Sequence, residues 1–135
     1  MDLDDSNVFI AVADDSVADA GSIPPLKNGD KTLARLQYDM IATHPYRYSE
    51  PDIAFETFAD HKAIASVDRP AARREFFSKG QPCLRASPLA KHYGWGFHKD
   101  KEGRVAMYAV GSKEYKRFEK DPRLKHVMAM RSSRA

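Results

Sequence analysis

Residues 95–110 read WGFHKDKEGRVAMYAV, and this stretch decides the fold class. Two runs rich in aromatic and aliphatic residues, 95–98 and 104–110, flank the polar segment KDKEG at 99–103. Two such runs joined by a short polar loop with a glycine are typical of an antiparallel hairpin. The stretch therefore predicts two neighbouring antiparallel strands, which disfavours a doubly wound parallel sheet.

Three further strands are expected outside the hairpin. The segment NVFIAVA at 7–13 is rich in β-branched side chains and predicts a first strand, and HVMAM at 126–130 predicts a last one. Between them, apolar residues alternate with more polar ones over residues 53–59, a period of two that favours a strand over a helix.

Helices are expected where capping residues coincide with helical spacing of apolar residues. Proline in the first turn and glycine after the last turn strengthen two of these predictions. The predicted helices cover residues 32–42, 70–79, 87–94 and 112–121. The elements together predict an α+β fold, with a mostly antiparallel sheet of about four to five strands and helices packed on one face.

The chain of 135 residues is the size of a single domain, expected to span 1–135. Its candidate flexible ends are an acidic N-terminal arm, 1–6, and a basic C-terminal tail, 131–135. No segment approaches the roughly 18 consecutive apolar residues of a membrane span. The acidic N-terminus is unlike a secretory signal, and the lone Cys83 fits a reducing compartment, so we expect a cytoplasmic protein without a membrane partner.

Charge is unevenly distributed along the chain. The formal net charge is +3, yet residues 1–25 contain six aspartates and no lysine or arginine. Residues 26–135 therefore hold 13 acids and 22 bases, a balance of +9, which favours anionic partners. Nucleic acid is the weaker candidate among them, because a basic balance explains nonspecific attraction and not specific recognition.

The run FFSKGQPCLRASPLAKHYGWGFH at 76–98 is unusually particular in composition. Together with VFIAVADDS, IPP, LQYDM, PYRY and MAMRSSRA, it resembles an uncharacterised family of small proteins, number 6157 among the domains of unknown function. The resemblance covers nearly the whole chain and is weakest after Phe58, in ADHKAIASVDRPAA. It implies a single-domain protein of this length and brings no known activity, substrate or partner.

Cys83 is the first candidate for chemistry. With Arg85, His92 and His98 nearby in the sequence, its thiol has a candidate base and a positive charge that would lower its pKa. The alternative is a buried thiol that packs as a small hydrophobic group, which is the commoner role of a free cysteine. No recognisable catalytic motif accompanies it, so the sequence leans against an enzyme.

The five histidines form no pair at the i, i+4 spacing of a helical metal site. We therefore expect no metal and no other cofactor.

The segment KHYGWGFH at 91–98 is the strongest candidate for recognition. Its two glycines allow close approach of a ligand to the backbone, and its aromatic rings offer flat faces for stacking. A ligand site formed by Arg85, Tyr93, Trp95 and His98 follows from this arrangement. The alternative is an ordinary core strand, since Trp95 and Phe97 lie two residues apart and so face the same side.

Three functions remain open at this level. The leading hypothesis is a binding domain for a small anionic or nucleotide-like ligand. The second is a cysteine-dependent enzyme that uses Cys83 with His92 or His98 as base. The third is a protein-interaction module, in which the acidic N-terminal arm pairs with a basic surface in a homodimer.

Overall fold

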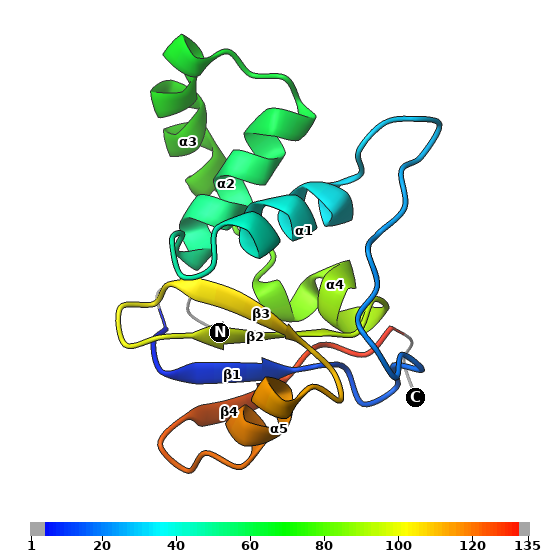
Figure 1. Cartoon of the computed structure of the whole chain (residues 1–135). Helices are drawn as coiled ribbons and strands as arrows, with labels where there is room; N and C mark the ends of the chain where they lie inside the picture. The colour runs from blue at the N-terminus through cyan, green and yellow to red at the C-terminus, as the bar shows by residue number, and fades with distance from the viewer. Residues whose placement is uncertain (1–4, 133–135) are drawn as a thin grey trace.

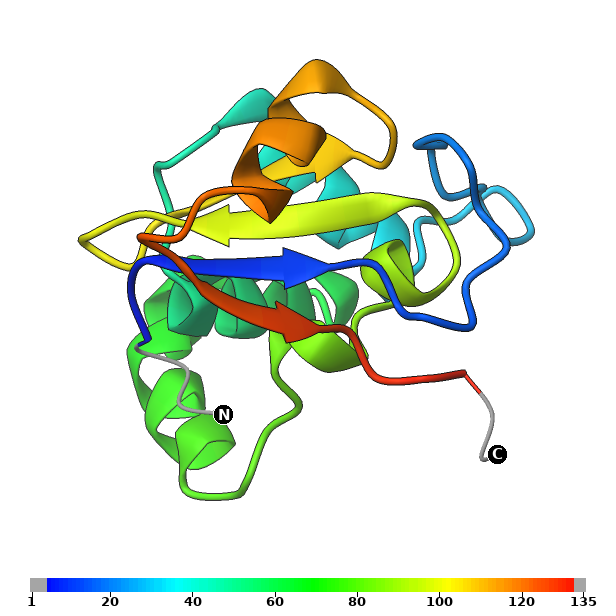
Figure 2. The same cartoon turned by 90° about the horizontal axis from the view of Figure 1, so that it is seen from below.

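The computed structural model describes residues 5–132 and contains one four-stranded sheet. Its strands are β1 (Val8–Ala11), β2 (Trp95–Lys99), β3 (Val105–Ala109) and β4 (Lys125–Met128), in the order β3-β2-β1-β4. The predicted hairpin is confirmed, because β2 and β3 pair antiparallel with Trp95 opposite Ala109. β1 lies inside the sheet, antiparallel to β2 and parallel to β4 (Figure 2).

In the part of the chain that the structure describes, five helices accompany the sheet: α1 (Leu33–Thr43), α2 (Glu50–His61), α3 (Arg69–Phe77), α4 (Pro88–Lys91) and α5 (Lys113–Glu119). Two 3-10 turns, η1 (Ser66–Asp68) and η2 (Leu84–Ala86), precede α3 and α4. The α+β class and the mostly antiparallel sheet are thus confirmed. Helices α1 and α4 lie over one face of the sheet with α2 and α3 beyond them, as expected, while the short α5 covers the opposite face (Figure 1).

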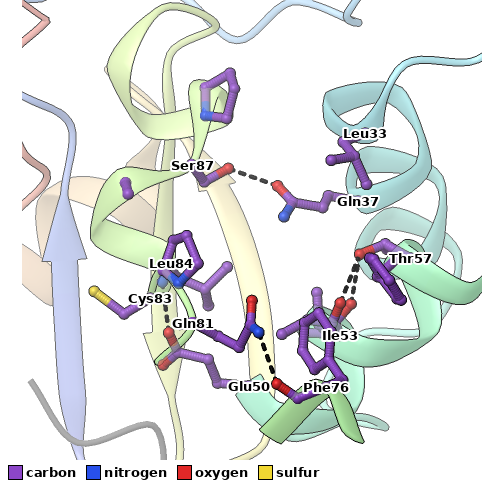
Figure 3. Close-up of a pocket in the computed structure, with 15 residues that line it drawn as sticks. Leu33, Gln37, Glu50, Ile53, Thr57, Phe76, Gln81, Cys83, Leu84 and Ser87 are labelled. Atoms are coloured by element: carbon purple, nitrogen blue, oxygen red, sulfur yellow. Dashed lines mark hydrogen bonds between the residues drawn. The ribbon is translucent and has the colours of Figure 1, made fainter. Parts of the chain in front are cut away.

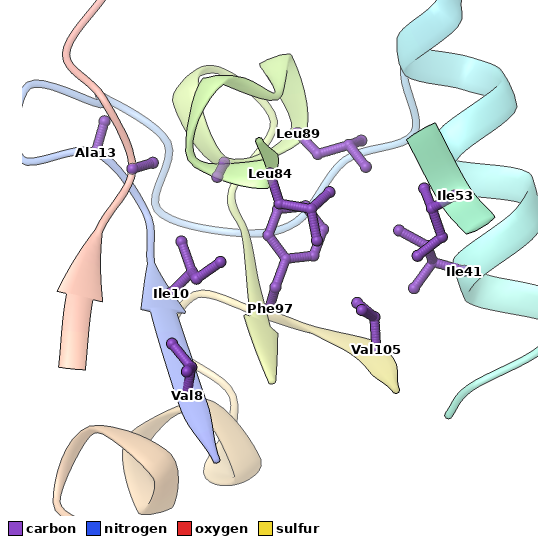
Figure 4. Packing of buried hydrophobic residues seen from close by; sticks show 11 residues of the cluster. Val8, Ile10, Ala13, Ile41, Ile53, Leu84, Leu89, Phe97 and Val105 are labelled. Atoms are coloured by element: carbon purple, nitrogen blue, oxygen red, sulfur yellow. The ribbon is translucent and has the colours of Figure 1, made fainter. Parts of the chain in front are cut away.

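The main core lies between the sheet and the first group of helices. Val8, Ile10 and Phe97 point from the strands toward Ile41 of α1 and Leu89 of α4, and all five side chains are buried (Figure 4). Alternate residues of a strand face opposite sides, so these positions define the helical face of the sheet.

A smaller aromatic core lies on the other face. Phe9 contacts the rings of Tyr115 and Phe118 in α5, with ring centroids 5.0 and 5.6 Å apart. Ser112 caps α5, because its hydroxyl accepts a hydrogen bond from the backbone N–H of Tyr115.

The strand predicted at 53–59 is wrong, since these residues form the middle of α2. Ser49 and Asp52 make a reciprocal capping box at the start of this helix, and Pro51 occupies its first turn. The alternating burial arises because two sides of the helix are covered. Ile53 belongs to the main core on one side, while the ring of Phe55 contacts that of Phe76 in α3 on the other.

The acidic N-terminal segment pairs with the C-terminal part of the same chain. Asp5 lies 3.6 Å from the ammonium of Lys125, and Asp14 lies 3.6 Å from the guanidinium of Arg131. Of the two predicted flexible ends, residues 1–4 and 133–135 lie outside the described residues. Within residues 5–132, no helix has the length and apolar character to cross a membrane.

Candidate ligand-binding site

The four residues predicted to bind a ligand are not brought together. Trp95 faces the helical side of the sheet, where its indole N–H donates to the carbonyl of Ser22 at 2.8 Å and its ring lies 5.6 Å from Tyr38. His98 faces the opposite side and stacks on Phe118 of α5 at 4.3 Å. The sheet therefore separates these two side chains.

Arg85 and Tyr93 have structural contacts elsewhere. Arg85 donates from Nε to the carbonyl of Met128 at 2.6 Å, and its own carbonyl accepts from the N–H of Met130. These bonds attach η2 to the end of β4. Tyr93 packs against the main core.

The glycines of the YGWG motif allow other segments of the same chain to pack closely against them. A Cβ atom on Gly94, whose φ is +79°, would lie 2.1 Å from the carbonyl oxygen of Ala20, and one on Gly96 would lie 2.6 Å from the ring of Tyr115. Both positions thus require glycine for internal packing. The close approach inferred from the sequence is that of neighbouring segments.

His98 is part of a hydrogen-bonded aromatic cluster. The hydroxyl of Tyr46 lies 2.7 Å from Nδ1 of His98 and 2.8 Å from the hydroxyl of Tyr108. Burial lowers the pKa of His98, partly offset by the charges of Asp100 and Asp121. A neutral imidazole accepts the Tyr46 proton at Nδ1, so the cluster ties the α1–α2 connection to the sheet.

Among residues 5–132, Cys83 makes no hydrogen bond to His92 or His98, its two candidate bases. Cys83 is half-buried just before η2, and its sulfur points away from the neighbouring cavity (Figure 3). His98 faces the α5 side of the sheet, whereas His92 is exposed after α4 with Nδ1 3.5 Å from the Ser132 hydroxyl. Residues 5–132 contain no cluster of His, Cys, Asp or Glu side chains suited to hold a metal.

A cavity of about 360 Å³ lies between α1, α2, the end of α3 and the segment 81–88 (Figure 3). Most of its lining is apolar. The lining residues are Leu33, Gln37, Glu50, Ile53, Ala54, Thr57, Phe58, Phe76, Gln81, Pro82, Cys83, Leu84, Ala86, Ser87 and Pro88. Its size is at the lower end of the roughly 300–1,000 Å³ typical of small-molecule sites.

Glu50 is the one charged side chain among the lining residues, and its charge is balanced by Lys99 of β2, which does not line the cavity. Its Oε1 lies 2.8 Å from the ammonium of Lys99, and its Oε2 accepts the backbone N–H of Leu84. The side chains of Lys99 and Glu50 are 0% and 2% exposed. The cavity therefore presents a paired carboxylate and no unbalanced charge.

Besides Glu50, the polar lining residues are the hydroxyl-bearing Thr57 and Ser87 and two amide side chains, Gln37 and Gln81. Gln37 of α1 accepts from the hydroxyl of Ser87 at 2.7 Å, and Gln81 donates to the carbonyl of Phe76 at 2.7 Å. Each amide uses one end in that contact and turns its other end toward the space between the cavity walls (Figure 3).

This cavity was missed by the sequence analysis, although one signal for it was present. Leu33, Gln37 and Ile41 are spaced by four residues, so Gln37 interrupts an otherwise apolar stripe of the predicted helix. A polar side chain on such a stripe is informative because buried polar groups require partners.

Fold and cavity together define a small α+β protein that contains a half-enclosed, mainly apolar cavity. The model of the family of unknown function DUF6157 matches residues 1–135, and the chain belongs to this family. No curated protein and no solved structure matches the chain.

Proposed function

We propose that this protein is a small-molecule-binding domain, and that its ligand occupies the cavity between α1, α2 and the segment 81–88. The observation that carries the proposal is an apolar cavity of about 360 Å³ without unbalanced charge. The ligand is uncharged and mainly apolar, because its binding energy comes from contact with Ile53, Phe58 and Phe76.

The charge of the lining supports a neutral ligand over the anionic one expected from composition. No lysine, arginine or histidine lines the cavity, and an anion there would face the carboxylate of Glu50. Burying an unpaired charge is far more costly than burying a neutral group. The anionic or nucleotide-like ligand expected at Arg85, Tyr93, Trp95 and His98 stays a prediction, and none of these four residues lines the cavity.

Binding of a neutral fluorescent probe tests the proposal. N-phenyl-1-naphthylamine is uncharged, brightens in apolar surroundings and is small enough for the cavity. We expect saturable binding of one probe per chain, and we expect Ala54→Phe to abolish it by filling the space beside α2. The matched control is Ala42→Phe, which places the same ring on an exposed position of α1 away from the lining.

Two results would contradict the proposal. One is the absence of saturable probe binding to the folded wild-type protein. The other is equal binding by the Ala54→Phe and Ala42→Phe proteins, which would locate the probe outside the cavity. Thermal-shift measurements with nucleotides and with neutral aromatic compounds test the charge argument, and the neutral compounds are expected to give the larger stabilisation.

A further inference from the structure

The orientation of the Gln81 amide is fixed by its partner. The carbonyl of Phe76 can only accept a hydrogen bond, so the Gln81 nitrogen must face it, at 2.7 Å. Oε1 of Gln81 is consequently the end that faces the cavity (Figure 3). It has no hydrogen-bond donor among residues 5–132 and is an unused acceptor in the cavity wall.

The orientation of the Gln37 amide follows from a chain of hydrogen bonds. The Ser87 hydroxyl accepts the N–H of Leu89 at its oxygen and donates its proton to Oε1 of Gln37 at 2.7 Å. Nε2 of Gln37 then faces the cavity without an acceptor among residues 5–132. The opposite wall thus supplies an unused donor.

We infer that the ligand carries an uncharged group that both donates and accepts, and that a carboxamide is this group. The inference rests on the proposed function and names the polar part of its ligand. The ligand's amide N–H₂ donates to Oε1 of Gln81, and its carbonyl accepts from Nε2 of Gln37. In an apolar site a few placed polar groups determine which ligand is preferred, because polar groups left unpaired on binding lose hydration without replacement.

Three ligands of equal size test this inference on the wild-type protein. 3-Phenylpropanamide offers the donor and the acceptor, 4-phenylbutan-2-one replaces the amino group by a methyl group, and 3-phenylpropanoate replaces it by a charged oxygen. We expect the amide to bind about three- to tenfold more tightly than the ketone, since one hydrogen bond is lost. The carboxylate should bind more than about tenfold more weakly than the amide.

Two variants assign the contacts. Gln81→Met keeps the length of the side chain and removes the acceptor, so it should lower the affinity for the amide to that for the ketone and leave the ketone unchanged. Gln37→Met removes the donor and should weaken both ligands about equally. The ligand series on the wild-type protein needs no variant, so the inference remains testable if either substitution impairs folding.

The outcomes separate the two proposals. Equal binding of amide and ketone, equal loss of both ligands in Gln81→Met, or carboxylate binding as tight as amide binding would each overturn the carboxamide inference while leaving a neutral binding site. Failure of all three ligands and of the naphthylamine probe to bind would overturn the proposed function itself.

Discussion

Lys99 lies on the helical face of β2, two residues after the buried Phe97, where the strand pattern calls for an apolar side chain. Its ammonium meets Glu50, the first residue of α2, and Glu50 also binds the backbone of Leu84 beside the cavity. This pair therefore links the sheet, α2 and the cavity wall through groups that water does not reach. Removing Lys99 leaves the Glu50 carboxylate buried without the ammonium group that balances its charge.

Lys99→Met is expected to lower the free energy of unfolding by about 3–5 kcal/mol, because it strands the Glu50 carboxylate. Urea denaturation at neutral pH measures this loss. The double variant Glu50→Gln with Lys99→Met should recover most of it, since a glutamine still accepts the N–H of Leu84. A Lys99→Met protein as stable as the wild type would show that the pair contributes no net stability.

At the scale of elements, α2 shows why local sequence patterns predict some elements correctly and others wrongly. The hairpin of β2 and β3 was predictable because its turn and both strands are contiguous in the chain. For α2, two local signals disagreed: the Ser49–Asp52 capping box indicates a helix, whereas the alternating apolar residues indicate a strand. The alternation arises because one side of α2 packs on α3, which lies later in the sequence and could not be taken into account. The cavity could not be predicted, because Gln37 and Gln81 line it from segments far apart in the sequence and no local pattern connects them.

Ser49→Ala tests the capping box directly. The substitution removes the acceptor for the N–H of Asp52 and is expected to lower the free energy of unfolding by about 1 kcal/mol. The control is Ser66→Ala in the exposed turn η1, where serine makes no cap. Thermal and urea denaturation compare the two variants, and equal stability of both would mean that the box does not hold the start of α2.

At the scale of the whole molecule, the buried residues lie mainly in β1, β2, β3 and the elements packed on them, including α2, and none lies in α3. No residue of α3 is buried, and its contacts with α2 include those of the Phe76 ring together with ion pairs at the surface. The ion pairs join Arg69 to Glu56 and Asp60, and Arg73 to Asp52. Segments with few buried contacts open at a lower free energy than the core. α3 contributes Phe76 to the lining of the cavity, so a bound ligand would contact this less protected helix.

Hydrogen exchange read by mass spectrometry tests this gradient. Amides of α3 are expected to exchange faster than those of β2, and a bound neutral probe should slow exchange in α3 through its contact with Phe76. The unliganded Ala54→Phe protein provides a reference with the cavity filled. Protection of α3 equal to that of β2 in the free protein would contradict the gradient.

The interior position of β1 has a consequence for biosynthesis. Val8 pairs with Lys99 on one side and with Lys125 on the other, partners that emerge from the ribosome roughly 90 and 120 residues later. The apolar strand β1 is therefore without its sheet neighbours while these later segments are still being synthesised. The sheet cannot close around β1 before β4 has been synthesised, so the segment VFIA must stay protected from other exposed strands during that interval.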